Sequence, residues 1–491
     1  MSSPARASIG DLFAPELRGA TVAILLTVAL AAFEGLAVAA ALPQVAADLG
    51  GIDLLPWVIT SFLLTSGVAT VATGPLVDAL GVQRVFKVAV AVFAIGGVVA
   101  GLTTTMPLMI AARLVQGAGA GATIAVGLAA VGLAFPGALV GRAFALNSTV
   151  WGVMGVAAPG LAAALLTVGS WRWIFLINLP LGLIALAAGW RALPAEPAAP
   201  GRAQIDTTGL VLVAAFTAAL LVAVDAIGPV SVPAGAVAAG LAWLYLRRAR
   251  AAHAPALKPR HVTVAPFGPL AWSVSLLLAG AFTMVAFVPL YVSGGRSAGA
   301  ALTAWSVLFF TVGWTTGANA ASRALDRTTE WTVMAVGHGL VVGNASLVGV
   351  LALVDAPLWT VFAALTAMGT GVGASTNAAL TLLRAVAHND ELGRATAAHQ
   401  FLRNQGFAIG AALGGAVILL VVGRAVGDVE RVRELLAGEV ADTSALVSSA
   451  LADGFGAAAL AGATVATSGL VPLVALRRHL TRAAIPDSST P

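Results

Sequence analysis

The sequence predicts an all-α polytopic membrane protein with fourteen transmembrane helices. Of its 491 residues, 59% are hydrophobic and only 10% are charged, which is too little charge to cover a soluble protein of this size. Apolar stretches of about 20 residues, the length that crosses a bilayer core, recur along the chain, with nearly all charges between them. The predicted spans are residues 20–42, 55–77, 85–104, 107–133, 142–168, 173–193, 207–225, 230–247, 266–292, 300–321, 331–353, 357–383, 396–422 and 454–476.

The distribution of basic residues predicts the orientation. An even number of spans places both termini on one side of the membrane. With that side cytoplasmic, most of the 26 Lys and Arg residues fall on inner segments, as the positive-inside rule requires. The outer segments then carry only Arg172, Arg296, Arg424, Arg431 and Arg433. This bias also explains the net charge of +5 without a nucleic-acid partner.

Several kinds of chemistry find no support in the sequence. The chain has no cysteine, which excludes disulfides and thiol chemistry. Glycine-rich runs at 117–121 and 369–373 resemble nucleotide loops, but neither follows a strand or leads to Gly-Lys-Ser/Thr, so they indicate helix packing. No spacing indicates a metal site or a nucleophile with its base. We therefore expect no metal, no cofactor and no enzyme activity.

Weak internal repetition predicts how the spans are grouped. Residues 74–78 follow the second span, and residues 322–327 follow the tenth, an equivalent place if two central spans are inserted. We therefore expect an N-terminal six-helix half at 1–193, a linker with two extra helices at 194–265, and a C-terminal six-helix half at 266–491. Facing halves are how many secondary transporters alternate access to a midplane site.

Two connections between predicted spans are long. The inner stretch 247–265 is basic and contains proline, which suits a cytoplasmic linker beside anionic membrane lipids. In the outer loop 423–453, residues 428–436 are spaced as a short amphipathic helix on the membrane surface. A solvated hairpin and a partner-binding site both fit this charge pattern, and the hairpin is favoured.

Four short motifs carry a family resemblance. Residues 74–84, GPLVDALGVQR, form a predicted loop after the second span, and residues 113–119, RLVQGAG, lie in the fourth. Residues 171–182, WRWIFLINLPLG, lead into the sixth, and Glu34 precedes Pro43 at the exit of the first. The chain resembles the major facilitator superfamily, and within it the fourteen-helix drug:proton antiporters. The resemblance covers essentially the whole chain. It implies the major facilitator fold, two six-helix halves plus two central extra helices, in a bacterial cytoplasmic membrane.

Some positions depart from the family pattern. Ala79 stands where the loop motif usually has Arg, and Gln83 replaces a basic residue. The fifth-span antiporter motif is eroded, although we still expect a helix bend at Gly155, Pro159 and Gly160. The resemblance to exporters is therefore weaker than the resemblance to the fold, and uptake by symport gains some weight.

Glu34 is the only acidic residue inside any predicted span. Counted from Ala20 at ~1.5 Å per residue, it lies ~21 Å into the membrane. A carboxylate there is costly, and alternating exposure to the two sides would make it a proton-binding group or the partner of a cationic substrate. The structural alternative is a permanently protonated side chain that is hydrogen-bonded between helices.

Arg113 lies about two turns into the fourth predicted span. It cannot lose its proton, so it needs an acceptor. The resemblance implies a role in proton coupling with Glu34. A structural clamp on backbone carbonyls satisfies the same buried charge equally well.

The motif after the second span supplies candidate gating residues. The resemblance makes its acid a latch between the halves, assisted by the arginine that follows. The gating residues are Gly74, Asp78, Gly81 and Arg84, and their second-half counterparts are Asp326 and Arg327.

Other polar and aromatic residues in the spans are candidate cavity residues. We expect most buried amides to form helix–helix hydrogen bonds worth ~0.6 kcal/mol each, and one or two to line a cavity. The candidates are Trp57, Asn147, Trp151, Trp314, His338 and Asn377.

Together these features predict a monomeric, proton-coupled secondary transporter that exports an organic amphipathic compound, as multidrug efflux proteins do. The proton gradient drives it, so no cofactor is needed. One alternative is an exporter of a native lipid or secondary metabolite. Another is a non-transporting receptor or assembly subunit on a transporter fold. Glu34, Arg113 and Asp78 argue against the latter, because a silent scaffold has little need of buried charge.

Overall fold

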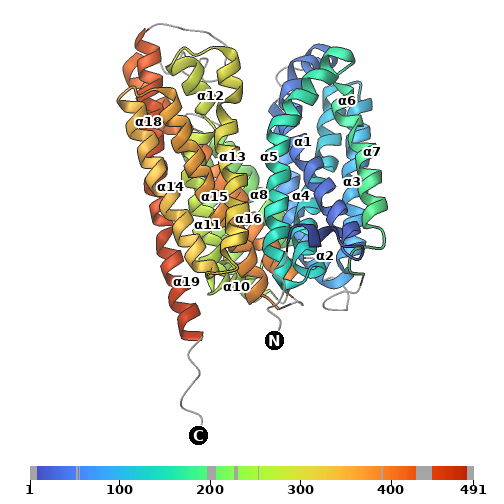
Figure 1. Ribbon diagram of the computed structural model, residues 1–491. Helices are drawn as coiled ribbons and strands as arrows, with labels where there is room; N and C mark the ends of the chain where they lie inside the picture. The colour runs from blue at the N-terminus through green and yellow to red at the C-terminus, as the bar shows by residue number, and fades with distance from the viewer. Residues whose placement is uncertain are drawn as a thin grey trace. The chain divides into compact units, whose positions relative to one another are not determined.

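The chain is helical throughout the part that the structure describes. The computed structural model describes residues 8–50, 54, 56–195, 206–225, 230–252, 254–388, 391–426 and 445–483, and these residues contain no strand. Each predicted span is occupied by one or more helices (Figure 1). Among the described residues, nine helices are long and apolar enough to cross a membrane, or ten if the bent α5 counts as one span.

The first helices follow the predicted spans closely. A short 3-10 helix, η1 (Gly10–Phe13), precedes the first of them. They are α1 (Arg18–Leu49), α2 (Pro56–Leu80), α3 (Val82–Leu102), α4 (Met106–Ala134), α5 (Gly137–Val168), α6 (Arg172–Leu176) and α7 (Asn178–Gly189).

The two central predicted spans are also helical, and the remaining spans follow them. The central helices are α8 (Thr207–Asp225) and α9 (Ser231–Ala251). After them come α10 (Pro259–Thr263), α11 (Phe267–Val285), α12 (Val288–Leu290), the π-helical η3 (Tyr291–Gly295), α13 (Ala300–Ala324), α14 (Glu330–Leu353), α15 (Leu358–Val386), α16 (Leu392–Val426), α18 (Ala445–Ser468) and α19 (Leu470–Ala483).

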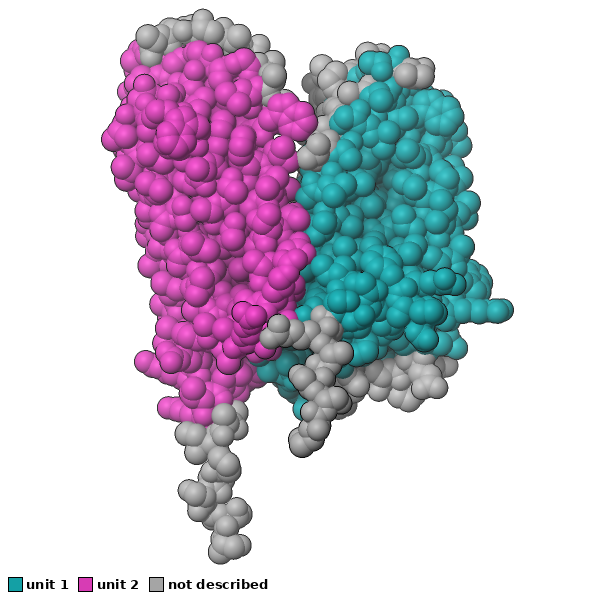
Figure 2. All heavy atoms as spheres, viewed as in Figure 1, with its two compact units in different colours: residues 1–218, 240–261, 380–401 teal, residues 219–239, 262–379, 402–491 magenta. Residues whose placement is uncertain are grey.

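The helices form two compact units (Figure 2). The first consists of residues 1–218, 240–261 and 380–401, and the second of residues 219–239, 262–379 and 402–491. The first unit thus includes the connection before α11 and the start of α16, in addition to the N-terminal helices. The unit boundaries fall inside helices, and the six-helix halves expected at 1–193 and 266–491 stay a prediction.

Two predicted loops are partly helical. α2 continues to Leu80 and α3 begins at Val82, so Gly81 alone separates them, with a φ of 82° that glycine adopts readily. The expected loop at 74–84 is therefore mostly helix. The outer loop expected at 423–453 is shorter, because α16 reaches Val426 and α18 begins at Ala445. The predicted surface helix at 428–436 lies outside the described residues.

Glycines set the closest helix contacts in the first unit. A Cβ atom on Gly117 would overlap the carbonyl oxygen of Phe62, and one on Gly121 would overlap that of Ser66. A step of four residues along α4 thus matches a step of four residues in the same chain direction along α2, so these helices run parallel. Membrane helices associate through such close approach because lipid supplies no hydrophobic drive between them.

The second unit repeats this arrangement with α15 and α13. A Cβ atom on Gly369 would overlap the carbonyl oxygen of Phe310, and one on Gly373 would overlap that of Trp314. The glycine-rich runs at 117–121 and 369–373 are therefore equivalent helix-packing surfaces. The weak sequence repeat has a structural counterpart in this pair of contacts.

We predict that Gly121→Ala destabilises the protein, whereas Gly127→Ala on the same helix does not. The new methyl group of the first variant meets the Ser66 carbonyl, and overpacking of this kind costs ~1–3 kcal/mol. At Gly127 the nearest atom is Thr27 Oγ1, 3.8 Å from the added Cβ. Thermal unfolding midpoints of the detergent-purified variants measure the difference. Equal midpoints would show that α2 and α4 do not pack through Gly121.

Candidate functional site

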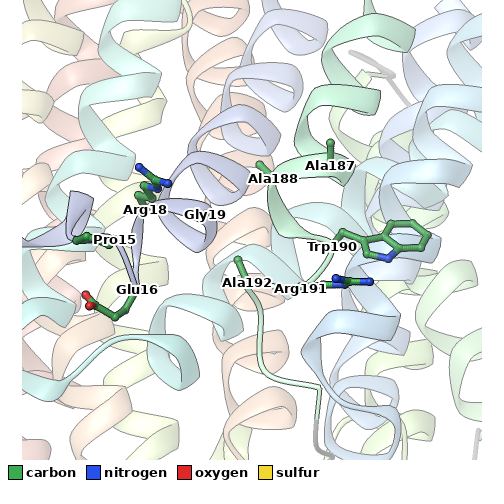
Figure 3. A pocket seen from close by; sticks show the side chains of 9 residues that line it. All are labelled: Pro15, Glu16, Arg18, Gly19, Ala187, Ala188, Trp190, Arg191 and Ala192. Atoms are coloured by element: carbon green, nitrogen blue, oxygen red, sulfur yellow. The ribbon is translucent and has the colours of Figure 1, made fainter.

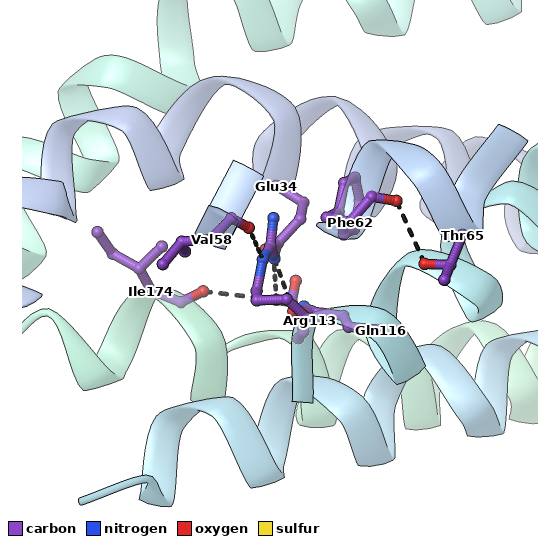
Figure 4. Close-up of polar contacts among 8 residues, drawn as sticks. Glu34, Val58, Phe62, Thr65, Arg113, Gln116 and Ile174 are labelled. Atoms are coloured by element: carbon purple, nitrogen blue, oxygen red, sulfur yellow. Dashed lines mark hydrogen bonds and ion pairs between the residues drawn. The ribbon is translucent and has the colours of Figure 1, made fainter. Parts of the chain in front are cut away.

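A buried ion pair between Glu34 on α1 and Arg113 on α4 forms the polar centre of the first unit (Figure 4). Both side chains are almost completely shielded from solvent. One carboxylate oxygen of Glu34 accepts a hydrogen bond from Arg113 Nη1, and the other accepts one from Asn178 Nδ2 at 2.7 Å. The two oxygens of Glu34 therefore face donors from two different helices, α4 and α7.

Arg113 has further acceptors besides Glu34. Its Nε donates to the carbonyl oxygen of Val58 at 3.0 Å, and its Nη1 donates to Gln116 Oε1 at 2.7 Å (Figure 4). The guanidinium also lies 4.1 Å from the ring centroid of Phe62, at cation–π distance. Arg113 thus pairs with Glu34 and also binds a backbone carbonyl, as a clamp would, and its role in proton coupling stays a prediction.

Local chain features place these partners. Gln116 is one helical turn beyond Arg113 on α4, so the two side chains share a face. The helix break at Ile177 puts Asn178 in the first turn of α7. Asn178 lies within the 171–182 motif, but nothing in the sequence pattern predicts that it contacts Glu34. An amide inside an apolar segment was the one available signal.

The equivalent place in the second unit is apolar. Gly117 corresponds to Gly369, which puts Leu365 and Met368 at the positions of Arg113 and Gln116. Both are completely buried. The two units therefore share the helix packing, and the ion pair belongs to the first unit.

The candidate cavity residues fall into two separate sets. Trp57, Asn147 and Trp151 belong to the first unit, and Trp314, His338 and Asn377 belong to the second. The tryptophans at 57 and 151 are about half exposed, whereas both asparagines are buried.

His338 is hydrogen-bonded between helices. Its Nδ1 lies 2.8 Å from the carbonyl oxygen of Met334, and its Nε2 lies 3.2 Å from that of Ser273 on α11. The ring is completely buried, and its Nε2 contact with Ser273 joins α14 to α11.

Asp78 binds the start of α16 inside the first unit. Its Oδ1 accepts a hydrogen bond from the backbone N–H of Gly393 at 3.0 Å, and its Oδ2 lies 3.4 Å from Arg394 Nη1. A Cβ atom on Gly74 would lie 2.9 Å from the Cα of Arg394, so the glycine permits this approach. The cationic partner of Asp78 is therefore Arg394, whereas the expected helper, Arg84, is exposed on α3.

The predicted residues of the second-half loop stand apart from these contacts. Asp326 and Arg327 are exposed in the turn after α13.

The helix α5 is bent where the sequence suggested a bend. Its segments Gly137–Gly155 and Gly160–Thr167 meet at an angle of 43°. The side chain of Pro159 lies outside the described residues, and a Cβ atom on Gly160 would meet nothing within 4 Å.

A cluster that the sequence did not predict lies next to the Asp78 contact. Glu391 accepts a hydrogen bond from Arg260 Nη2 at 3.1 Å, and its other oxygen lies 3.2 Å from His261 Nε2. Burial lowers the pKa of His261 to about 4, although its hydrogen bond to Glu391 opposes the shift, so the imidazole is neutral at pH 7. The cluster joins the basic connection before α11 to the residue that precedes α16.

The long apolar helices of the described residues are those of a multi-pass membrane protein. A family model described as Major Facilitator Superfamily matches residues 22–411, and the chain belongs to that superfamily. The family resemblance drawn from the sequence is therefore confirmed at the level of the superfamily.

Curated relatives include bacterial transporters. The uncharacterized MFS-type transporter Rv1877 of Mycobacterium tuberculosis is 30% identical over 432 residues, which cover 85% of this chain and 62% of that protein. The multidrug efflux pump SdrM of Staphylococcus aureus is 27% identical over 203 residues, 41% of this chain and 45% of the pump. The riboflavin transporter RibZ of Clostridioides difficile is 28% identical over 205 residues, 42% of this chain and 45% of that protein. The chain thus spans less than two thirds of the length of these relatives.

Solved structures confirm the major facilitator fold, and the count of fourteen spans stays a prediction. The human organic anion transporter MFSD10 matches with a TM-score of 0.61 at 16% identity, covering 94% of this chain and 99% of that structure. The proton:xylose symporter XylE matches with a TM-score of 0.61 at 12% identity, covering 94% and 98%. At these identities the matches show the fold alone.

We predict that Asp78→Asn loosens the start of α16. The amide keeps an acceptor for Gly393 but loses the ion pair with Arg394. The chain has no cysteine, so Thr396→Cys, which puts a small side chain at a buried site, introduces a single reporter thiol. A hydrophilic maleimide should label this thiol several-fold faster when Asp78 is also replaced.

Asp326→Asn in the same reporter background is the matched control, since Asp326 is exposed. It should leave the labelling rate unchanged. Equal rates for both aspartate variants would show that Asp78 does not hold this helix.

Proposed function

We propose that this chain is a proton-coupled exporter of organic amphipathic compounds in a bacterial cytoplasmic membrane, with both termini cytoplasmic and fourteen spans. The observation that carries the proposal is the buried Glu34–Arg113 ion pair, because intramembrane ionisable groups usually mark ion or substrate pathways. The similarity to multidrug efflux pumps such as SdrM supports the direction of transport and the class of cargo.

The surroundings of Arg113 suit a group that gains and loses its partner. When a proton neutralises Glu34, the ion pair is lost, but the carbonyl of Val58 and the amide of Gln116 still accept from the guanidinium. The stacked ring of Phe62 also remains. Arg113 is thus never left without acceptors, which lowers the cost of protonating Glu34.

Protonation of Glu34 would also change how helices are tied together. The carboxylate joins α1 to α4 through Arg113 and α1 to α7 through Asn178. A neutral carboxyl binds both donors more weakly, because charge-assisted hydrogen bonds are the stronger kind. In the proposed cycle, a proton from outside loosens these ties and favours release of the cargo. Loss of the proton to the cytoplasm restores them and permits a new molecule to bind.

The contact of Asp78 with the start of α16 serves as the cytoplasmic latch in this cycle. The exporter works as a monomer with the proton gradient as its only energy source. A native lipid or secondary metabolite would use the same proton chemistry, so the cargo has to be identified by transport measurements.

We predict that Glu34→Gln abolishes proton-coupled transport. Purified protein in liposomes, with an internal pH-sensitive dye and an imposed proton gradient, should release protons when a suitable compound is added. The panel contains lipophilic cations, neutral drugs and lipid-like compounds. Glutamine keeps the size of the side chain but cannot take up a proton, so compound-dependent release should fall to background.

Two further variants make the result decisive. Asp453→Asn removes an exposed acid from α18 and should leave proton release unchanged. Glu34→Gln leaves the Arg113 charge uncompensated, which costs ~3–5 kcal/mol for a buried pair. The double variant Glu34→Gln/Arg113→Gln removes both charges. It therefore tests proton coupling in a protein that has no uncompensated charge at this site. Full coupled transport by either Glu34 variant would disprove the proposed role.

A further inference from the structure

We propose that a pocket where the start of α1 meets the end of α7 binds the headgroup of an anionic phospholipid. The pocket lies in the first unit and has a volume of about 610 Å³ (Figure 3). It does not include Glu34 or Asp78, so the proposal is independent of the cargo and of proton coupling.

The residues around the pocket favour an anion. Figure 3 shows Arg18 and Arg191 on opposite sides of the small residues between them. Both arginines are exposed, and neither forms an ion pair with a carboxylate of the described residues. A third cation is close by, since Lys87 Nζ lies 4.1 Å from the ring centroid of Trp190. Glu16 is the one acidic residue in the lining.

The position of the pocket matches the level of lipid headgroups. α1 begins at Arg18 and α7 ends at Gly189, so the pocket lies at the ends of two membrane helices. Trp190 is 53% exposed there, and tryptophan is enriched at the boundary between membrane and water. At the membrane surface, the phosphate groups available to such a pocket are those of phospholipid headgroups.

The segment before α1 is anchored beside the pocket. In η1, Leu12 is completely buried, and its carbonyl oxygen accepts a hydrogen bond from Thr21 Oγ1 at 2.5 Å. Phe13, the next residue, is 46% exposed. This segment therefore presents an aromatic ring at the helix end, as interfacial segments do.

Apolar surface leads from the pocket along both helices. On α7, Leu183 and Ile184 lie one turn before the pocket alanines and are 55% and 53% exposed. On α1, Val22 lies one turn beyond Arg18 and is also exposed. These side chains offer a face to the acyl chains below a charged headgroup. Free phosphate would make no use of this face, so the occupant is a lipid.

The floor of the pocket is made of small side chains. A Cβ atom on Gly19 would lie 2.7 Å from that of Ala192, which places α1 and the residues after α7 in close contact. Ala187 and Ala188 extend this surface without filling the space above it. A bulky side chain at Ala187 would occupy the site without changing its charge.

The test is native mass spectrometry of the full-length protein, purified in detergent, with phosphatidylglycerol or phosphatidylcholine added at equal concentration. The protein should retain phosphatidylglycerol in preference. Arg18→Gln/Arg191→Gln should lower that retention about 25-fold, because each cation near a membrane surface contributes about fivefold. Equal retention of the two lipids by the unmodified protein would overturn the proposal, as would undiminished retention by the double variant.

Matched variants separate this site from general charge effects and from misfolding. Arg323→Gln/Arg327→Gln removes the same charge from exposed positions near the end of α13 and should retain phosphatidylglycerol. Ala187→Trp keeps every charge and should lose the lipid by filling the pocket, which tests the site even if the arginine variant fails to fold. Excess inorganic phosphate should not displace the lipid. Displacement by phosphate would identify a simple anion site and reject the lipid.

Discussion

The first unit depends on the burial of one ion pair, Glu34 with Arg113. Two charges in a helix bundle lose their hydration, a penalty of several kcal/mol per ion that other partners must offset. These partners come from neighbouring helices: Val58 on α2, Gln116 on α4 and Asn178 on α7. A shift of any of these helices would leave a charged or polar atom unsatisfied. The ion pair therefore sets their mutual register as well as providing the proposed proton site.

Close packing through glycine makes this register attainable. Gly117 lets α4 approach the backbone of α2 at Phe62, whose ring covers the guanidinium of Arg113 at 4.1 Å. The second unit repeats the same contact through Gly369, but it has Leu365 where the first unit has Arg113. Helix packing is thus common to both units, whereas the buried charge is not. Such an asymmetry confines the proposed proton chemistry to the first unit.

The ion pair between Asp78 and Arg394 at the start of α16 differs from the Glu34–Arg113 pair in its access to water. Arg394 keeps 20% of its side chain exposed, against 3% for Arg113, whereas the carboxylates of Asp78 and Glu34 are both buried. Pairs that reach water are weaker and exchange their partners more easily than dry ones. Such a contact suits a latch that opens and closes in the proposed cycle. The neighbouring pair of Glu391 and His261 adds the connection before α11 to the same contact.

Local patterns in the sequence were sufficient to identify the membrane environment, the helical stretches and Glu34 as an isolated buried acid. The length of an apolar stretch, and a single acidic residue within it, can both be recognised from one segment of the sequence. Local patterns could not predict which residues contact these groups. Asn178 lies beside Glu34, and Arg394 lies beside Asp78 in place of Arg84. Segments far apart in the chain meet there only through helix packing. Hydrophobicity selects which segments enter the membrane, but the register between helices decides which polar atoms meet, and that register arises from tertiary contacts.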